Sequence, residues 1–288
     1  MDKIGKAIKR AKESSAAWSQ SPGDAGFLLQ DSQSSMVGSA AGAPQPWEKE
    51  VVLNSTHLES NRIIAHDIVD PRSKSFDMLR TQVLQSMAMK SWQVLGITSP
   101  TAGCGKSLIS VNLALSVARQ PGRSVLLIDM DLQKPQVAKS LGLNCKRGLI
   151  SVLEGRTSLR SAMTQVQIND EKLLVLPCET PNINSSEWMT SPSMAALWQE
   201  IKRDFRGWTV ILDLPPMLLS DDVISILPQI DCVMFVATVG ISTIREIKEC
   251  TRHLESASIV RVVLNKSTDA ITSYYSRYGH YLAADAKK

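Results

Sequence analysis

The sequence predicts an α/β fold in which a parallel sheet is covered by helices on both faces. Its 288 residues are 43% hydrophobic and 21% charged, which suffices for one such domain with a sizeable core and flanking tails. Short apolar runs alternate with longer segments of helical periodicity, as expected for repeated strand–helix–strand units. We interpret as strands the residues 94–97, 124–129, 173–176, 231–238, 259–264 and a run that ends at 213. The helical segments are 73–89, 108–119, 148–153, 159–163, 195–205 and 242–254.

A glycine-bearing turn separates the strand at 94–97 from the helix that begins near Leu108. It reads Ser-Pro-Thr-Ala-Gly-Cys-Gly-Lys-Ser over residues 99–107. Glycine lets backbone N–H groups approach phosphate oxygens, and the helix N-terminus adds partial positive charge. Lys106 would then reach the β- and γ-phosphates of a nucleotide, and the Ser107 hydroxyl would coordinate Mg²⁺.

This turn departs from the common phosphate-loop pattern GxxxxGK[ST], because Pro100 occupies the place of the first glycine. The alternative interpretation is an ordinary turn between a strand and a helix. The flanking strand and helix favour phosphate binding. The residues expected to contact the nucleotide are Thr101, Ala102, Gly103, Cys104, Gly105, Lys106, Ser107 and Leu108.

Carboxylates follow two further strands. Asp129 and Asp131 stand with alternate spacing at the end of one apolar run, and Asp213 closes another. Ligands of parallel α/β sheets bind beyond the carboxyl ends of the strands. We therefore expect Lys106, Ser107 and these three carboxylates at one edge of the sheet, as Mg²⁺–nucleotide chemistry requires.

Three segments carry a resemblance to a known family, namely GITSPTAGCGKS (96–107), VLLIDMDLQKP (125–135) and VILDLPP (210–216). In this order and spacing they resemble the bacterial tyrosine autokinases of capsule and exopolysaccharide export, which are P-loop NTPases of the deviant Walker type. The resemblance covers about residues 73–281. Supporting residues are Asn112-Leu-Ala, the segment Ser185 to Pro192, Asp222 and Val263-Leu-Asn265. The resemblance implies that the chain uses ATP and Mg²⁺ to phosphorylate its own tail tyrosines between subunits and so regulates polysaccharide polymerisation and export.

The site residues receive roles on this basis. Lys106 and the loop amides hold the phosphates, while Ser107 and Asp213 hold Mg²⁺, Asp213 through a water molecule. Asp131 supports the metal shell. Asp129 orients or deprotonates the attacking tyrosine hydroxyl. Phosphoryl transfer relies mainly on positioning and charge neutralisation, which such a set can supply.

Asn265 ends the last expected strand. It matches the position that contacts adenine in related ATPases, so we include it among the nucleotide-binding residues. The alternative is a turn residue that caps the strand, since asparagine is common in turns.

Two places depart from the family pattern. Relatives carry Glu-x-x-Arg-x-x-Arg in the first helix, which builds their oligomeric ring, but Lys74, Asp77 and Arg80 stand here. The apolar stripe of this helix alone indicates packing on the sheet. Relatives also place an arginine two residues after the second aspartate, where this chain has Gln133, followed by Lys134.

The domain at 49–266 is expected to lie between two less ordered segments. Residues 1–12 form a short basic amphipathic helix, and residues 13–48, rich in Ser, Ala, Gly and Pro, form a disordered linker. The tail at 267–288 contains all four tyrosines of the chain, which are the expected phosphoacceptors Tyr274, Tyr275, Tyr278 and Tyr281. The alternative is an aromatic segment that docks on a partner.

Composition and charge argue against two classes of protein. A net charge of +4 is too mild to argue for a nucleic-acid binder. Five scattered cysteines suggest a reducing compartment and not a disulfide framework. We see neither an apolar stretch of about 18 to 20 residues nor a signal peptide, so we expect a cytoplasmic protein. The resemblance implies peripheral attachment at the inner membrane through a membrane-embedded co-polymerase that activates the kinase. It also implies a homo-oligomer and a candidate cognate tyrosine phosphatase.

Two rival functions remain. Partitioning and positioning ATPases share the fold but carry a signature lysine five positions before the conserved one, where this chain has Thr101. The losses at Asp77 and Gln133 would also fit a non-catalytic nucleotide-binding scaffold for polysaccharide export.

Overall fold

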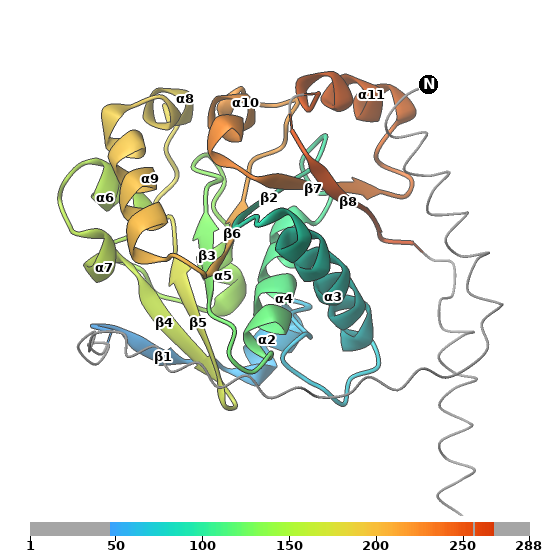
Figure 1. The fold of residues 1–288 in the computed structure, drawn as a ribbon. Helices are drawn as coiled ribbons and strands as arrows, with labels where there is room; N and C mark the ends of the chain where they lie inside the picture. Colours follow the sequence, from blue (N-terminus) through green and yellow to red (C-terminus); the bar gives the residue numbers. More distant parts are fainter. Residues whose placement is uncertain (1–46, 256, 268–288) are drawn as a thin grey trace, which may run out of the picture. The chain divides into compact units, whose positions relative to one another are not determined.

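The structure is a computed structural model that describes residues 47–255 and 257–267 (Figure 1). This part of the chain folds around an eight-stranded sheet with the strand order β1-β4-β5-β3-β6-β2-β7-β8. Neighbouring strands are parallel except β4 and β5, which form an antiparallel hairpin. The strands are β1 (Glu50–Val52), β2 (Val94–Thr98), β3 (Val125–Asp129), β4 (Thr164–Ile168), β5 (Glu171–Leu176), β6 (Thr209–Asp213), β7 (Cys232–Thr238) and β8 (Ile259–Asn265).

The central strands β3, β6, β2 and β7 are buried along their whole length. They are mainly apolar because layers of helices cover both faces of a parallel sheet. Asp129 of β3 lies opposite Asp213 of β6, and Asp213 lies opposite Ile97 of β2. Parallel pairing thus gathers the carboxyl ends of β2, β3 and β6 at one edge of the sheet.

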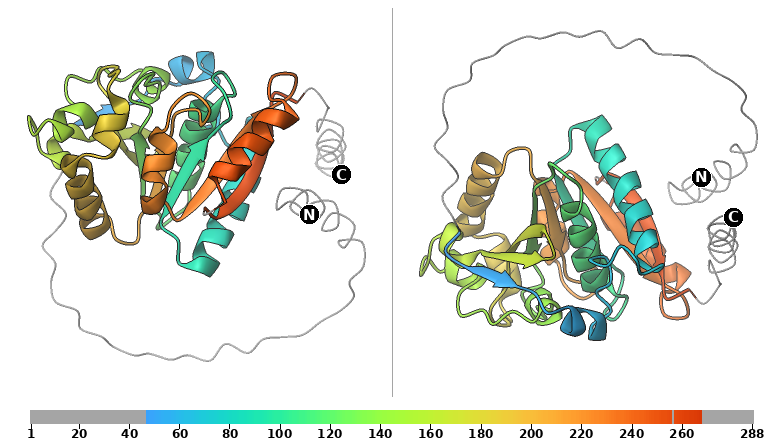
Figure 2. Two further views of the ribbon diagram at one scale, coloured as in Figure 1. Left: turned by 90° about the horizontal axis from the view of Figure 1, so that it is seen from above. Right: turned by 90° about the horizontal axis from the view of Figure 1, so that it is seen from below.

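Two apolar clusters pack the helices onto the two faces of the sheet. The ribbon views from above and below show helices on both sides of the sheet (Figure 2). One face is covered by α2 (Ser55–Ser60), α3 (Ser73–Lys90), α4 (Lys106–Ala118) and α5 (Val137–Leu141). The other is covered by α6 (Leu149–Leu153), α7 (Leu159–Ala162), α8 (Ser185–Met189), α9 (Pro192–Asp204), α10 (Asp222–Ile226), the 3₁₀ turn η2 (Leu227–Gln229) and α11 (Ile244–His253). The expected α/β fold with helices on both faces is confirmed, with the β4–β5 hairpin as the one exception to parallel pairing among the described strands.

The stretch between position 49 and α3, in which the sequence analysis assigned no strand or helix, contains β1 and α2. Asn54 begins α2 by accepting a hydrogen bond from the His57 backbone N–H. The ordered packing also starts slightly earlier than position 49. The Trp47 ring stacks on Phe205 with centroids 6.4 Å apart, and the Arg160 guanidinium lies 4.3 Å above the Trp47 ring. We therefore place the start of the domain at Trp47.

The expected basic helix at 1–12, nearly all of the linker at 13–48 and all four tail tyrosines lie outside the described residues.

Candidate functional site

The turn at 99–105 connects β2 to α4 at the carboxyl edge of the sheet (Figure 1). Gly103 and Gly105 have φ angles of 78° and 90°, a left-handed conformation that side chains other than glycine rarely adopt. A Cβ at Gly105 would also lie 2.3 Å from Nδ2 of Asn265. Both glycines of the motif are thus required by the backbone, and α4 begins directly after them at Lys106.

Lys106 and Asp131 form the central ion pair of the site, with Nζ 2.6 Å from Oδ2. Both are buried, with 8% and 3% of their surfaces exposed. Burial acts to lower the pKa of Lys106, but the charges of Asp213 and Asp131 outweigh it, so the pKa is raised. The ammonium is therefore firmly charged and held at the P-loop.

The other oxygen of Asp131, Oδ1, accepts the Lys134 backbone N–H at 3.0 Å. Asp129 is fully buried, and its Oδ2 accepts the backbone N–H groups of Gln136 and Val137 at 3.0 and 2.9 Å. Its Oδ1 accepts the Asp131 N–H at 3.3 Å. Burial, with the charge of Asp213, raises the pKa of Asp129 well above its usual range. Asp129 thus fixes the loop that carries Asp131.

Asp213 is the carboxylate with an available oxygen. Its Oδ1 accepts the Ser110 hydroxyl at 3.1 Å, while Oδ2 is buried and lacks a hydrogen-bond partner in the described part of the chain. Burial raises its pKa, opposed by the charge of Lys106 and by hydrogen bonding from Ser107 and Ser110. Because Ser107 and the Asp213 carboxylate meet beside Lys106, their oxygens suit a hydrated divalent cation bound to a phosphate. The oxygens of Asp131, in contrast, already have partners.

The structure brings Lys106, Ser107, Asp129, Asp131 and Asp213 together, as the sequence predicted for one sheet edge. The sequence did not identify Ser110, Thr238 and Lys266 as members of the site. Ser110 stands one helical turn after Lys106, a spacing that could have revealed it. Thr238 and Lys266 donate hydrogen bonds to backbone carbonyls of the turn at 99–105. Side chains that bind backbone groups do not form a recognisable sequence motif.

Gln133 and the first helix have local partners. Gln133 Nε2 donates to the Ser185 hydroxyl at the start of α8, at 2.8 Å. In α3, Asp77 Oδ1 lies 3.1 Å from Arg80 NH1 and 3.2 Å from Arg119 NH1 of the residue that caps α4. Ser116 of α4 also donates to Asp77. Asp77 and Arg80, two of the three residues at the place of the family's ring motif, are therefore engaged within the domain.

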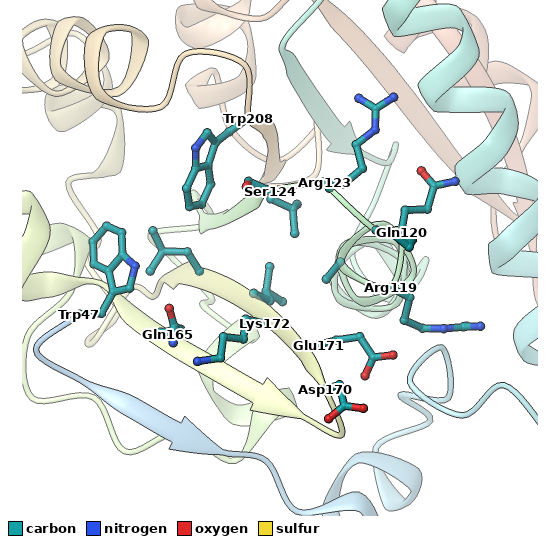
Figure 3. Close-up of a pocket in the computed structure, with 16 residues that line it drawn as sticks. Trp47, Arg119, Gln120, Arg123, Ser124, Gln165, Asp170, Glu171, Lys172 and Trp208 are labelled. Carbon is teal, nitrogen blue, oxygen red and sulfur yellow. The ribbon is translucent and has the colours of Figure 1, made fainter. Parts of the chain in front are cut away.

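A hollow of about 440 Å³ lies at the edge of the sheet opposite the P-loop, beside the amino ends of β3, β5 and β6 (Figure 3). Trp47 and Trp208 border it at one end, and Arg123 and Lys172 add positive charge. It lies at the far end of α4 from Lys106, so it is separate from the P-loop edge.

Comparisons with known proteins point to the same family as the resemblance described in the sequence analysis. Residues 95–283 match the CobQ/CobB/MinD/ParA nucleotide binding domain family. The putative tyrosine-protein kinase EpsB of Ralstonia nicotianae is 30% identical over 79% of this chain. The tyrosine-protein kinase YwqD of Bacillus subtilis is 33% identical over 58% of this chain and 68% of that protein. The crystal structure of the chimerical protein CapA2B2 covers 77% of this chain and 94% of its own, with 26% identity and a TM-score of 0.64.

The chain spans 30% of the length of EpsB, so the match concerns one part of that longer protein. YwqD, in contrast, is matched over most of its length, and the sequence resemblance stated above is thereby confirmed. The chain belongs to the CobQ/CobB/MinD/ParA nucleotide binding domain family and, within it, to the bacterial tyrosine-protein kinases.

Proposed function

We propose that the chain is an ATP-dependent protein-tyrosine autokinase that phosphorylates its own tail tyrosines between subunits and regulates the polymerisation and export of a capsule or exopolysaccharide. The observation that carries this proposal is the meeting of Lys106 with three buried carboxylates at the edge where β2, β3 and β6 end. Family membership and the confinement of every tyrosine to the tail support it.

The phosphate chain of ATP would lie on the amides of Thr101 to Leu108. Lys106 neutralises charge on the β- and γ-phosphates, for which its ammonium must turn from Asp131 toward the phosphates. Asp131 keeps that ammonium at the site between turnovers. Phosphoryl transfer gains most from such charge neutralisation and positioning.

Magnesium would be held by the Ser107 hydroxyl, by phosphate oxygens and, through water, by the free oxygen of Asp213. Within residues 47–255 and 257–267, no group of three or more His, Cys, Asp and Glu side chains is arranged to hold a metal by itself. In this arrangement the nucleotide supplies part of the coordination, as is usual for Mg²⁺ in such enzymes. We propose a supporting role in the metal shell for Asp131.

Asp129 is proposed to orient the tyrosine hydroxyl or accept its proton. Its raised pKa moves the carboxyl toward the range in which a general base works near neutral pH. Its Oδ1, which accepts only the Asp131 N–H at 3.3 Å, is the oxygen with room to accept the hydroxyl.

No helix in the described ranges is both long and apolar enough to span a membrane. We propose that the protein acts at the cytoplasmic side of the inner membrane, recruited and activated by a membrane-embedded polysaccharide co-polymerase. We further propose a homo-oligomer whose tails are dephosphorylated by a cognate tyrosine phosphatase. Nucleic acid is not among the proposed partners, because the net charge is only +4.

The test is phosphotyrosine formation by the purified protein with labelled ATP and Mg²⁺, with and without a candidate activator. Lys106→Ala removes the ammonium at the phosphates and should abolish labelling and weaken ATP binding. Mutation of the exposed Lys248 to Ala is the matched control and should change neither. Retained ATP binding without labelling under every activator would replace this proposal with the scaffold function.

A further inference from the structure

Two exposed apolar side chains border the P-loop edge of the sheet. Ile183, in the loop before α8, is 93% exposed, and Leu219, in the loop before α10, is 61% exposed. The helices α8 and α10 lie next to each other at the top of Figure 1, at the edge where the central strands end. Single exposed apolar side chains are common, but two that border one site are a candidate contact surface.

The backbone next to each of these side chains is bound to the site. The Asn182 N–H donates to the Leu132 carbonyl at 2.7 Å, directly after Asp131. The Leu218 N–H donates to the Pro100 carbonyl of the P-loop at 3.1 Å. One apolar side chain is therefore placed beside the loop that carries Asp131, and the other beside the P-loop.

Polar side chains join the starts of the two helices. Ser186 Oγ lies within hydrogen-bond distance of Asp221 Oδ1, at 2.5 Å, and of Asp222 Oδ1, at 2.9 Å. Gln133 Nε2 donates to the Ser185 hydroxyl of α8 at 2.8 Å. The loops before α8 and α10 are thereby held in a fixed arrangement, as a docking surface requires.

The charges of this edge complement those of the tail. Asp221 and Glu187 are exposed carboxylates at the start of α10 and in α8. In the tail, Arg277 stands among the four tyrosines, while Ile271 precedes them and Leu282 follows them. The tail thus offers a cation and apolar groups to a surface that has carboxylates and apolar groups, and such complementarity gives specificity.

The sheet topology favours the tail of a second copy over the chain's own tail. The tail follows β8 at one end of the sheet, whereas the loops before α8 and α10 follow β5 and β6. In the strand order, β2 and β7 lie between β6 and β8, and the P-loop follows β2. A chain's own tail would have to cross the place of the nucleotide, while a neighbour's tail can approach from outside.

We propose that the loops before α8 and α10, with the first turns of these helices, form a docking surface for residues 271–282 of a second copy of this chain. The surface consists of Ile183, Leu219, Asp221 and Glu187. Its apolar side chains bind the apolar residues of the tail and its carboxylates bind Arg277, which presents a tyrosine to the site. This inference rests on the proposed function and names the residues that select its substrate.

The first test measures binding of a fluorescent peptide of residues 268–288 to the full chain by fluorescence anisotropy. Ile183→Ser combined with Leu219→Ser should raise the Kd of the peptide at least about tenfold, because two apolar contacts are lost. The affinity for Mg·ATP should stay unchanged, since neither side chain belongs to the P-loop. Met89→Ser, at a residue of α3 that is 78% exposed, is the matched control and should change neither affinity. An unchanged Kd of the peptide in the double variant would overturn the proposal.

The second test exchanges the charges. Glu187→Lys should weaken binding of the wild-type peptide by about threefold, as expected for an exposed ion pair. A peptide with Arg277→Glu should bind the wild-type chain more weakly and the Glu187→Lys chain more tightly than the wild-type peptide does. Equal binding of both peptides by both chains would overturn the role of the carboxylates.

The third test identifies the chain whose tail docks. Competition between the peptide and the protein's own tails should increase with protein concentration if the tails dock on second copies. Competition that is independent of concentration would show docking within one chain and overturn this part of the proposal. Peptide binding needs no phosphoryl transfer, so a chain that binds the peptide here but never labels would contradict the proposed function alone. Labelling that is unchanged in the double variant would contradict the docking surface alone.

Discussion

At the scale of single residues, the site sets three buried carboxylates against one ammonium. Asp131 shares its charge with Lys106, and Asp129 is surrounded by backbone N–H groups. The charge of Asp213 is incompletely compensated, since one of its oxygens is buried and lacks a hydrogen-bond partner within the described residues. A buried charge with so little compensation costs stability, and functional sites commonly carry such a cost.

Asp213→Asn should therefore stabilise the nucleotide-free protein while removing activity. The variant should be about 1 kcal/mol more stable at pH 7, because a neutral side chain replaces a poorly compensated buried charge. Burial raises the folded-state pKa of Asp213, so the contribution of this group to the free energy of unfolding is most favourable at low pH and falls as the pH rises through that pKa. The advantage of the variant should thus grow from pH 4 to pH 7 in urea unfolding. Mg²⁺-dependent phosphorylation should fall at least about 10²-fold. A less stable variant at pH 7 would contradict this account.

The sequence predicted which residues would meet at this edge of the sheet, but not which hydrogen bonds and ion pairs they would make. Lys106, Asp129, Asp131 and Asp213 were predicted because they follow strands that had to be parallel neighbours. The Lys106–Asp131 pair and the use of Asp129 by the backbone depend on how the loop at 130–137 folds. That loop has no periodicity from which its path could be inferred.

At the scale of elements, α4 links the P-loop to the rest of the fold. Asn112 in this helix is fully buried, and its Oδ1 accepts the backbone N–H groups of Ile64 and Ala65 at 2.8 and 2.9 Å. Its Nδ2 donates to the Arg62 carbonyl at 3.2 Å. One side chain thus attaches the loop after α2 to the helix that presents Lys106.

Asn112→Ala should destabilise the domain by about 2–4 kcal/mol, because it leaves the buried N–H groups of Ile64 and Ala65 without acceptors. Urea unfolding would measure the change. The exposed control Asn144→Ala should stay within about 0.5 kcal/mol of the wild type. A loss below about 1 kcal/mol in Asn112→Ala would show that other groups satisfy this loop.

Long apolar elements were predicted from the sequence and short polar ones were not. The predicted ranges of the helix α3 and the strand β7 agree with the observed bounds to within two residues, because each has a long and regular apolar pattern. β4 was missed because Thr164–Ile168 alternates buried and half-buried residues over only five positions. β1 was also missed. It has only three residues, all exposed, and pairs with β4, so it is too short to show a recognisable strand pattern in the sequence.

At the scale of the whole molecule, phosphoryl transfer between chains requires the tail of one chain to reach the P-loop of another. The described residues end at Ser267, seven positions before the first tyrosine. Closing a longer connection adds entropy cost only slowly, so transfer between chains needs no short tether. Asp77 and Arg80 already contact α4, so we expect the copies to meet through other surfaces.

The most direct measurement mixes two chains, neither of which can label its own tail, in the presence of the activator, Mg²⁺ and ATP. One chain carries Lys106→Ala with its tail intact, and the other has a wild-type site with Tyr274, Tyr275, Tyr278 and Tyr281 changed to Phe. Phosphotyrosine should appear on the Lys106→Ala chain, and mass spectrometry should place it on the tail. If the wild type labels itself under the same conditions while the mixture stays unlabelled, transfer between subunits is wrong.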